Sequence, residues 1–129
     1  MKNRARALTL IGILAGMVLL FQRCKYDVVP SVPSGPVSFH DNILPLFRST
    51  CAISGCHDNV APGGGLILLD SVAYVNLYRH HEVDTLNPQA SVIYNRMNSV
   101  LTPMPPTGKT SSSNISMVLR WIVQGGRNN

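Results

Sequence analysis

Two cysteines and a histidine lie close together near the middle of the chain, in the stretch CAISGCHD. Cys51 and Cys56 are separated by four residues, and His57 follows the second cysteine directly. At this spacing, thiol and imidazole groups can close a disulfide, bind a metal ion, supply a nucleophile or hold a covalent prosthetic group. Because each of these roles fixes the backbone locally, this motif constrains the fold more than any other feature of the sequence.

The beginning of the chain predicts an export signal. Lys2, Arg4 and Arg6 precede an uncharged, largely apolar run over residues 7–21. This run is shorter than the ~20 apolar residues that a membrane span needs, and it fits the apolar region of a secretory signal. We assign residues 1–23 to an export signal of the lipoprotein type, with an uncleaved membrane anchor as the alternative.

Cys24 lies where such a signal would be processed, and it resembles the lipidated first residue of a bacterial lipoprotein. Without a lipid it would be an odd thiol in an exported protein. The preceding residues FQR, which end in Arg23, differ from the small residues usual at this kind of processing site. We expect a lipid on Cys24 to hold the protein to a membrane, on the periplasmic or cell-surface side.

The segment after Cys24 is a tether followed by one domain. Residues 24–36 include VVPSVPSGP, and a chain rich in Pro, Ser and Gly stays extended without a core. The remaining residues, 37–129, form one domain of fewer than a hundred residues. A domain of this size has little core of its own, so a bound apolar cofactor would help it to fold.

The charge of the chain argues against nucleic-acid binding. The formal net charge is +5, but from Cys24 onward seven Lys/Arg face six Asp/Glu, which leaves +1. No Lys/Arg cluster remains to follow a phosphate backbone. We therefore exclude a nucleic-acid partner and expect no strong electrostatic steering of a protein partner.

Periodicity predicts a mostly helical domain. A first helix begins at Ser38, with Asp41 three residues later as in a capping box, and Pro45 should kink it. After a glycine-containing loop and a short extended segment, a second helix covers residues 71–78. The predicted buried face of the first helix consists of Phe39, Ile43, Leu44 and Phe47.

Two further helices are predicted in the second half of the domain. Asn87 as cap and Pro88 at the first position begin one of them, and its predicted face consists of Val92, Ile93 and Met97. The closing helix ends at Gly125 and Gly126, with a predicted apolar face of Ile115, Val118, Leu119 and Ile122. The domain is thus all-α with long irregular loops.

Three chemistries other than haem can be weighed for the motif. A structural zinc site needs four ligands; the motif offers three, and the fourth would be His40, His80 or His81. A disulfide between the two cysteines would persist outside the cytoplasm but gives the adjacent histidine no role. A nucleophilic cysteine needs a lowered pKa and a positioned base, and the sequence shows no separate carboxylate to orient that base.

Covalent haem is the fourth possibility. The usual attachment signature is C-x-x-C-H, whereas this chain has C-x-x-x-x-C-H. The vinyl groups of haem have a fixed separation, so the intervening AISG would have to bulge outward. Gly55 permits such a bulge because glycine adopts backbone angles closed to other residues.

The surroundings of the motif resemble those of small class I cytochromes c, particularly the planctomycete-type and related lipoprotein cytochrome c domains. NILPLF is similar to the first helix of that family, MPPTGK to the loop that presents a distal methionine, and ISMVLRWIVQGGRNN to the closing helix. The resemblance covers residues 37–129. It implies an all-α cytochrome c-like domain around one haem c, held covalently by Cys51 and Cys56, with His57 as proximal and Met104 as distal iron ligand.

The resemblance also implies electron transfer outside the cytoplasm, with redox proteins as partners. Ligation of the iron by His57 and Met104 leaves no position for a substrate, so we expect neither an enzyme nor a small-molecule substrate. His80 or His81 could replace Met104, although such a pair is more often a solvated loop. Two other functions stay open: a haem-free, disulfide-stapled surface module, and a peroxidase-like haem subunit in which Met104 is off the iron.

Overall fold

The computed structural model describes residues 35–129, so the predicted signal, Cys24 and most of the tether lie outside the described residues. Helices and loops make up this part of the chain, and no β-strand occurs within it. No helix among the described residues is long and apolar enough to cross a membrane. The prediction of an all-helical domain is therefore confirmed at the level of secondary structure. Its helices are α2 (Leu44–Thr50), α3 (Asp70–Arg79), α4 (Val92–Asn98) and α5 (Ser112–Val123), with short helical turns η2 (Phe39–Ile43), η3 (Gly63–Gly65) and η4 (Pro88–Ala90).

The first helical segment begins where the sequence predicts. The Ser38 hydroxyl accepts a hydrogen bond of 3.1 Å from the backbone N–H of Asp41, which caps the turn. The turn η2 is a π-helix, in which the N–H of Leu44 bonds to the carbonyl of Phe39 five residues earlier. Pro45 then lies in the first turn of α2, where a missing N–H leaves no helical hydrogen bond unmade. The expected kink is therefore a widened turn that comes before the proline.

An aromatic cluster joins this segment to α3 and α5. Phe39 and Trp121 are each 1% exposed, and their ring centroids are 5.4 Å apart. Tyr74 packs edge-on against Phe39 at 5.3 Å, and Phe47 does so at 6.4 Å. The Trp121 indole N–H donates a 2.9 Å hydrogen bond to the carbonyl of Arg127. Trp121 thus packs on the first helical segment.

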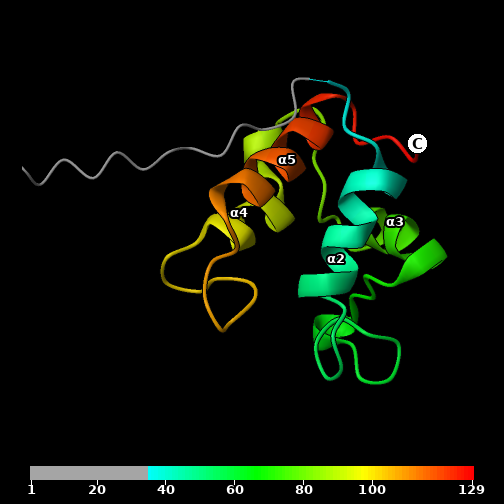
Figure 1. Ribbon diagram of the computed structural model, residues 1–129, viewed down its shortest axis with the longest axis vertical. Coiled ribbons are helices and arrows are strands. Elements are labelled where there is room, and N and C mark those ends of the chain that lie inside the picture. Colours follow the sequence, from blue (N-terminus) through cyan, green and yellow to red (C-terminus); the bar gives the residue numbers. More distant parts are fainter. Residues whose placement is uncertain (1–34) are drawn as a thin grey trace, which may run out of the picture.

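The two ends of the described chain are bonded to one another. Asn129 accepts hydrogen bonds from Ser38, Phe39 and His40 at 2.7 to 3.0 Å, and the Gln124 side chain accepts one from Val37 N–H at 2.8 Å. Figure 1 shows both ends of the domain at the top, whereas the loop after α2 and the loop between α4 and α5 extend toward the bottom. The chain therefore enters the domain at the end opposite these loops.

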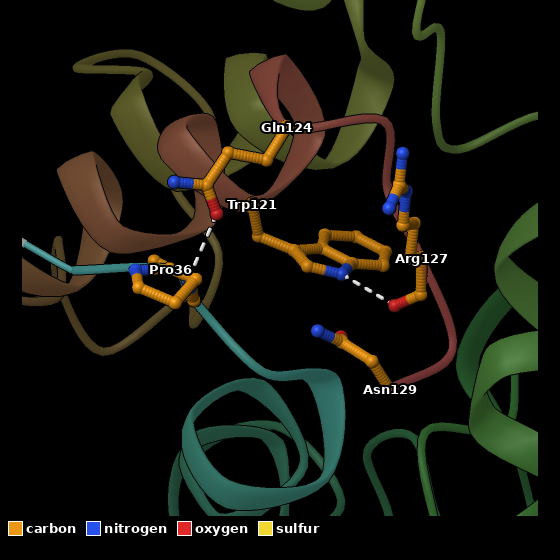
Figure 2. A pocket seen from close by; sticks show the side chains of 6 residues that line it. Pro36, Trp121, Gln124, Arg127 and Asn129 are labelled. Carbon is orange, nitrogen blue, oxygen red and sulfur yellow. Dashed lines mark hydrogen bonds between the residues drawn. The ribbon is translucent and has the colours of Figure 1, made fainter.

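A cavity of about 270 Å³ lies at this junction of the two ends. Figure 2 shows that the Gln124 amide and the Trp121 indole, which line the cavity, are engaged in hydrogen bonds with the neighbouring backbone. The Gln124 amide joins the two chain ends, whereas the Trp121 indole holds the C-terminal segment against α5. The residues that line the cavity are Pro36, Val37, Trp121, Gln124, Arg127 and Asn129.

The prediction of where the third helix starts is wrong. The turn η4 is a 3₁₀ turn, and α4 begins only after Ser91, whose backbone is not helical (φ −53°, ψ 131°). The Asn87 side chain makes no capping bond. Instead the Asp84 carboxylate accepts the N–H groups of Leu86 and Asn87, both at 2.9 Å, and the buried Ser91 hydroxyl accepts the N–H of Asp84. These hydrogen bonds interrupt the helix that the local sequence favours.

The predicted helix faces are largely, but not fully, correct. In α4 two of the predicted core residues are buried, but Val92 is 42% exposed. In α5 Leu119 is only partly buried, and Trp121 takes a core position beside the three other predicted residues. Gly125 and Gly126 end α5 as expected, both at positive φ, with N–H groups bonded to the carbonyls of the last turn.

Candidate functional site

The motif begins where α2 ends and closes a compact turn. The N–H of Cys51 bonds to the carbonyl of Phe47 at 2.8 Å, so the first cysteine still belongs to the last helical turn. The N–H of His57 then returns to the carbonyl of Cys51 at 3.1 Å. Between them Gly55 is exposed and has a φ of +79°, as expected of the residue that permits the bulge. The cysteines and the histidine therefore share one closed turn.

Cys51 and Cys56 are both free thiols, and both are half-buried. The Thr50 hydroxyl is hydrogen-bonded to the Cys51 sulfur at 3.3 Å. Burial raises the pKa of the Cys51 thiol, and the neighbouring Cys56 adds to this effect, so the thiol stays protonated at neutral pH. A cysteine nucleophile needs the opposite shift, and the geometry at Cys51 therefore does not favour nucleophilic catalysis.

The His57 ring is oriented by a backbone carbonyl. Its Nδ1 lies 3.1 Å from the carbonyl oxygen of Leu66. Because a carbonyl only accepts hydrogen bonds, the neutral ring carries its proton on Nδ1 and keeps the lone pair of Nε2 for a metal ion. The backbone pairs again two residues further on, where the N–H of Leu68 donates to the carbonyl of His57 at 2.9 Å. The segment after the glycine turn thus holds both the ring and the backbone of His57 by hydrogen bonds.

Gly63 lets this segment approach His57, although the sequence analysis gave the glycine run no role. Its N–H donates a 2.6 Å hydrogen bond to the carbonyl of Cys56. A Cβ at this position would lie 3.3 Å from that carbonyl oxygen and 3.7 Å from Cε1 of His57. The close approach therefore favours glycine, and a glycine run soon after a Cys-His pair is the signal that could have identified it.

Asp58 is a second residue that the sequence analysis missed. Its side chain is 7% exposed within an otherwise exposed loop. Its Oδ1 accepts the N–H groups of Val60 and Ala61 at 3.2 and 3.1 Å, and its Oδ2 accepts that of Gly55 at 3.1 Å. The hydrogen bonds from Ala61 and Gly55 lower the pKa of Asp58. An aspartate among small and polar loop residues often bonds to nearby backbone in this way, which is the signal available in the sequence.

Met104 lies on a different loop, between α4 and α5. The loop folds back on the end of α4, because the N–H of Met104 donates to the carbonyl of Arg96 at 3.0 Å and the Arg96 side chain donates to the Thr102 hydroxyl. Met104 is 37% exposed, and two aliphatic side chains of the same loop, Val100 and Leu101, are 82% and 93% exposed. In Figure 1 this loop and the motif loop extend toward the same end of the molecule, on opposite sides of it. The loop that carries Met104 thus points toward the same end as the motif loop but lies on the other side of the molecule (Figure 1).

The two adjacent histidines are placed differently. His80 ends α3, and its Cε1 would lie 3.5 Å from a Cβ placed on Gly65, so its ring lies against the glycine turn near the motif. His81 is exposed and has a φ of +57°. Burial raises the pKa of Glu82, while His57, His80 and Arg96 oppose this shift. His80 and Glu82 therefore belong to the polar surroundings of His57, and His81 belongs to a solvated turn.

Metal chemistry of the zinc type finds no ready site in the part of the chain that the structure describes. Among those residues no group of three or more His, Cys, Asp or Glu side chains is placed to hold a metal ion. Iron held within a haem by one histidine and one methionine does not require such a group. The residues of the motif loop thus fit covalent haem in three respects: two thiols not joined in a disulfide, an oriented imidazole, and a glycine at the bulge.

Comparisons with known proteins leave the functional argument to this geometry. No family model matches the chain. Searches of curated proteins and of solved structures likewise find no match.

Proposed function

We propose that the protein is an exported monohaem cytochrome of the c type that transfers electrons outside the cytoplasm. One observation carries this proposal: two free thiols lie in one closed turn with a histidine whose Nδ1 is held by the carbonyl of Leu66. A disulfide alone would give no reason for that orientation of the ring. A haem attachment site requires it, because the iron takes the other ring nitrogen.

Each residue of the proposed site has a separate task. Cys51 and Cys56 would hold the haem through thioether bonds, and His57 Nε2 and Met104 Sδ would hold its iron. A bound haem supplies one-electron transfer. The carbonyl of Leu66 fixes the tautomer of His57 and strengthens Nε2 as a donor.

Met104 suits the distal position by its chemistry and by its loop. A thioether is a soft, neutral ligand, and His/Met ligation raises the reduction potential of a haem. Prolines at 103, 105 and 106 restrict the backbone around the sulfur, and the bond to Arg96 attaches the loop to α4. The exposed aliphatic side chains of the same loop support an apolar group at this end of the domain.

The proposed role is that of an electron carrier and not of an enzyme. His57 and Met104 would both bind the iron, which would leave no position for a substrate. The chain enters the domain at the end opposite the motif loop (Figure 1). A tether over residues 24–36 with a lipid on Cys24 would therefore leave the motif end free to meet redox partner proteins.

An absorption spectrum tests this proposal most directly. The protein is produced in an export host that matures c-type cytochromes, and its spectrum is recorded before and after extraction with acidified acetone. A reduced c-type spectrum that survives extraction is expected. A colourless, folded product from a host that matures a control cytochrome would indicate the disulfide-stapled module instead, and rapid binding of small ligands to the ferric protein would indicate a peroxidase-like subunit.

Variants test the ligands one at a time. Met104→Ala should retain the haem but change its spin state and potential, whereas Met117→Ala, on α5, should leave both unchanged. His57→Ala should greatly reduce haem retention. A spectrum unchanged in Met104→Ala but changed in His80→Ala would transfer the distal role to His80.

Mass spectrometry of the mature N-terminus tests the anchor. A diacylglycerol group on Cys24 would support the lipoprotein proposal. A free N-terminus downstream of Cys24 would exclude it, and an intact residue 1 would indicate an uncleaved anchor.

A further inference from the structure

The residue directly after the motif is a buried carboxylate in an exposed loop. Asp58 is 7% exposed, whereas Gly55, Val60 and Ala61, whose N–H groups it binds, are exposed. Burying a carboxylate is costly unless hydrogen bonds replace its water. Among the described residues no buried side-chain nitrogen or oxygen lacks a partner, so these three bonds satisfy Asp58. The loop is therefore folded around this side chain.

The two carboxylate oxygens bond to backbone that precedes His57 and to backbone that follows it in the sequence. Oδ2 accepts the N–H of Gly55, which lies in the bulge between the two cysteines. Oδ1 accepts the N–H groups of Val60 and Ala61, which lie after the histidine. One side chain thus ties the bulge to the loop that follows it and fixes the backbone on both sides of His57.

The widened motif explains why such hydrogen bonds are needed. Four residues between the cysteines have more backbone freedom than two, and each residue that must be ordered costs conformational entropy. The first part of the bulge is held by Ala52, which is buried in the core. The second part, Ser54 and Gly55, is exposed and carries no apolar side chain, so the hydrogen bond from Gly55 to the buried carboxylate orders it.

We propose that Asp58 is a positioning residue that makes the C-x-x-x-x-C-H motif competent for haem attachment. By fixing the bulge before the haem is attached, it keeps Cys51, Cys56 and His57 in one arrangement. This inference rests on the proposed function. Its structural part, that Asp58 orders the motif before any haem is attached, can be tested without haem.

The chain offers a matched control. Asp84 makes the same kind of bonds in another loop, where its carboxylate accepts the N–H groups of Leu86 and Asn87, both at 2.9 Å. Asp84→Ala therefore removes a comparable backbone anchor without touching the motif. Asp58→Ala removes all three bonds at the motif, and Asp58→Asn keeps one carbonyl oxygen as acceptor and should rescue part of the effect.

The first experiment uses the full chain without haem. Hydrogen exchange by NMR reports the amides of Gly55, Val60 and Ala61, and equilibration with glutathione reports the effective concentration of Cys51 and Cys56 for one another. Asp58→Ala should raise exchange at the three amides at least tenfold and change the effective concentration severalfold, with Asp58→Asn in between. Unchanged exchange, or an equal change at these amides in Asp84→Ala, would overturn the inference.

The second experiment measures covalent haem per polypeptide in a maturation-competent host. Asp58→Ala should lower this ratio at least fivefold, while Asp84→Ala should match the wild type. An unchanged ratio in Asp58→Ala would overturn the positioning role, even if the loop had loosened. If the wild type itself takes up no haem, the proposed function fails, and the exchange and thiol measurements still decide whether Asp58 orders the motif.

Discussion

The end of α5 provides a prediction with a magnitude that follows from the structure. Gly126 is buried, has a φ of +56°, and donates its N–H to the carbonyl of Trp121 at 2.9 Å. Its own carbonyl accepts a 2.6 Å hydrogen bond from the hydroxyl of Tyr78, which belongs to α3. A Cβ on Gly126 would collide with that hydroxyl oxygen and lie 3.3 Å from Thr85 Cγ2. We therefore expect Gly126→Ala to destabilise the domain through both backbone strain and the displacement of Tyr78.

The magnitude has two parts. The left-handed backbone conformation costs a residue with a side chain about 1–2 kcal/mol. Moving the Tyr78 hydroxyl costs about 1 kcal/mol for its hydrogen bond and about 1 kcal/mol for its aromatic contact with Tyr74, whose ring centroid is 5.0 Å away. The neighbouring Gly125, with a φ of +97°, shares the strain, but a Cβ there would meet only the Arg127 side chain at 3.7 Å. Gly126→Ala should thus cost about 2 kcal/mol more than Gly125→Ala, or roughly 10 °C in Tm for a domain of this size.

Urea unfolding followed by circular dichroism measures both variants, and the double variant Gly126→Ala/Tyr78→Phe separates the two parts. Removing the hydroxyl relieves the collision, so the double variant should be more stable than the sum of the single effects by at least 1 kcal/mol. Equal costs for Gly125→Ala and Gly126→Ala, or additive effects in the double variant, would show that Tyr78 does not limit this position.

Three further predictions follow from burial. Burial, reinforced by Tyr74, raises the pKa of Tyr78 to about 12, so the folded state favours the neutral phenol. The free energy of unfolding, measured with urea, should therefore fall as the pH rises from about 10 to 12. The Tyr78→Phe variant should show a smaller loss. Burial also raises the pKa of Cys51. In the haem-free Cys56→Ser variant, peptide mapping should therefore show that Cys51 is alkylated severalfold more slowly than free cysteine at pH 8. Equal rates would contradict this prediction. Ile122 is 0% exposed and Val123 is 63% exposed, so Ile122→Ala should lower the free energy of unfolding by about 2–5 kcal/mol and Val123→Ala by less than about 0.5 kcal/mol; similar costs would mean that α5 is oriented differently.

The sequence predicts those parts of the fold that depend on neighbouring residues. Ser38 caps its turn, α3 begins within a residue of its predicted start, and two glycines end α5, because each signal acts within one helical turn. The start of α4 could not be predicted in this way. Asn87 and Pro88 favour a helix locally, but the bonds between Asp84 and the buried Ser91 span seven residues and prevent it from continuing. Hydrogen bonds between residues seven apart here override the preference of the residues between them.

The same distinction holds at the site. The bulge at Gly55 could be predicted because only the identity of that residue permits it. The orientation of His57 could not, because it depends on the backbone carbonyl of Leu66, which any residue would supply. Asp58 lies between these cases: its side chain type suggests a loop anchor, but only the folded chain shows that its two oxygens reach both sides of the histidine.

The fold stabilises its two ends by different means, and this division bears on the proposed function. The end that holds the chain termini contains the large buried aromatic residues Phe39 and Trp121 and can stabilise itself. The motif end is held by backbone hydrogen bonds, by Asp58 and by the edge of the same core, where Phe47, Ala52, Leu66 and Leu68 are buried beside the motif. Such an end keeps a defined shape through its backbone hydrogen bonds as well as through its core. That is what covalent attachment of an apolar group demands, because the thiols and the histidine must be in place before the group arrives, and the apolar surface that completes this end would then come from the group itself.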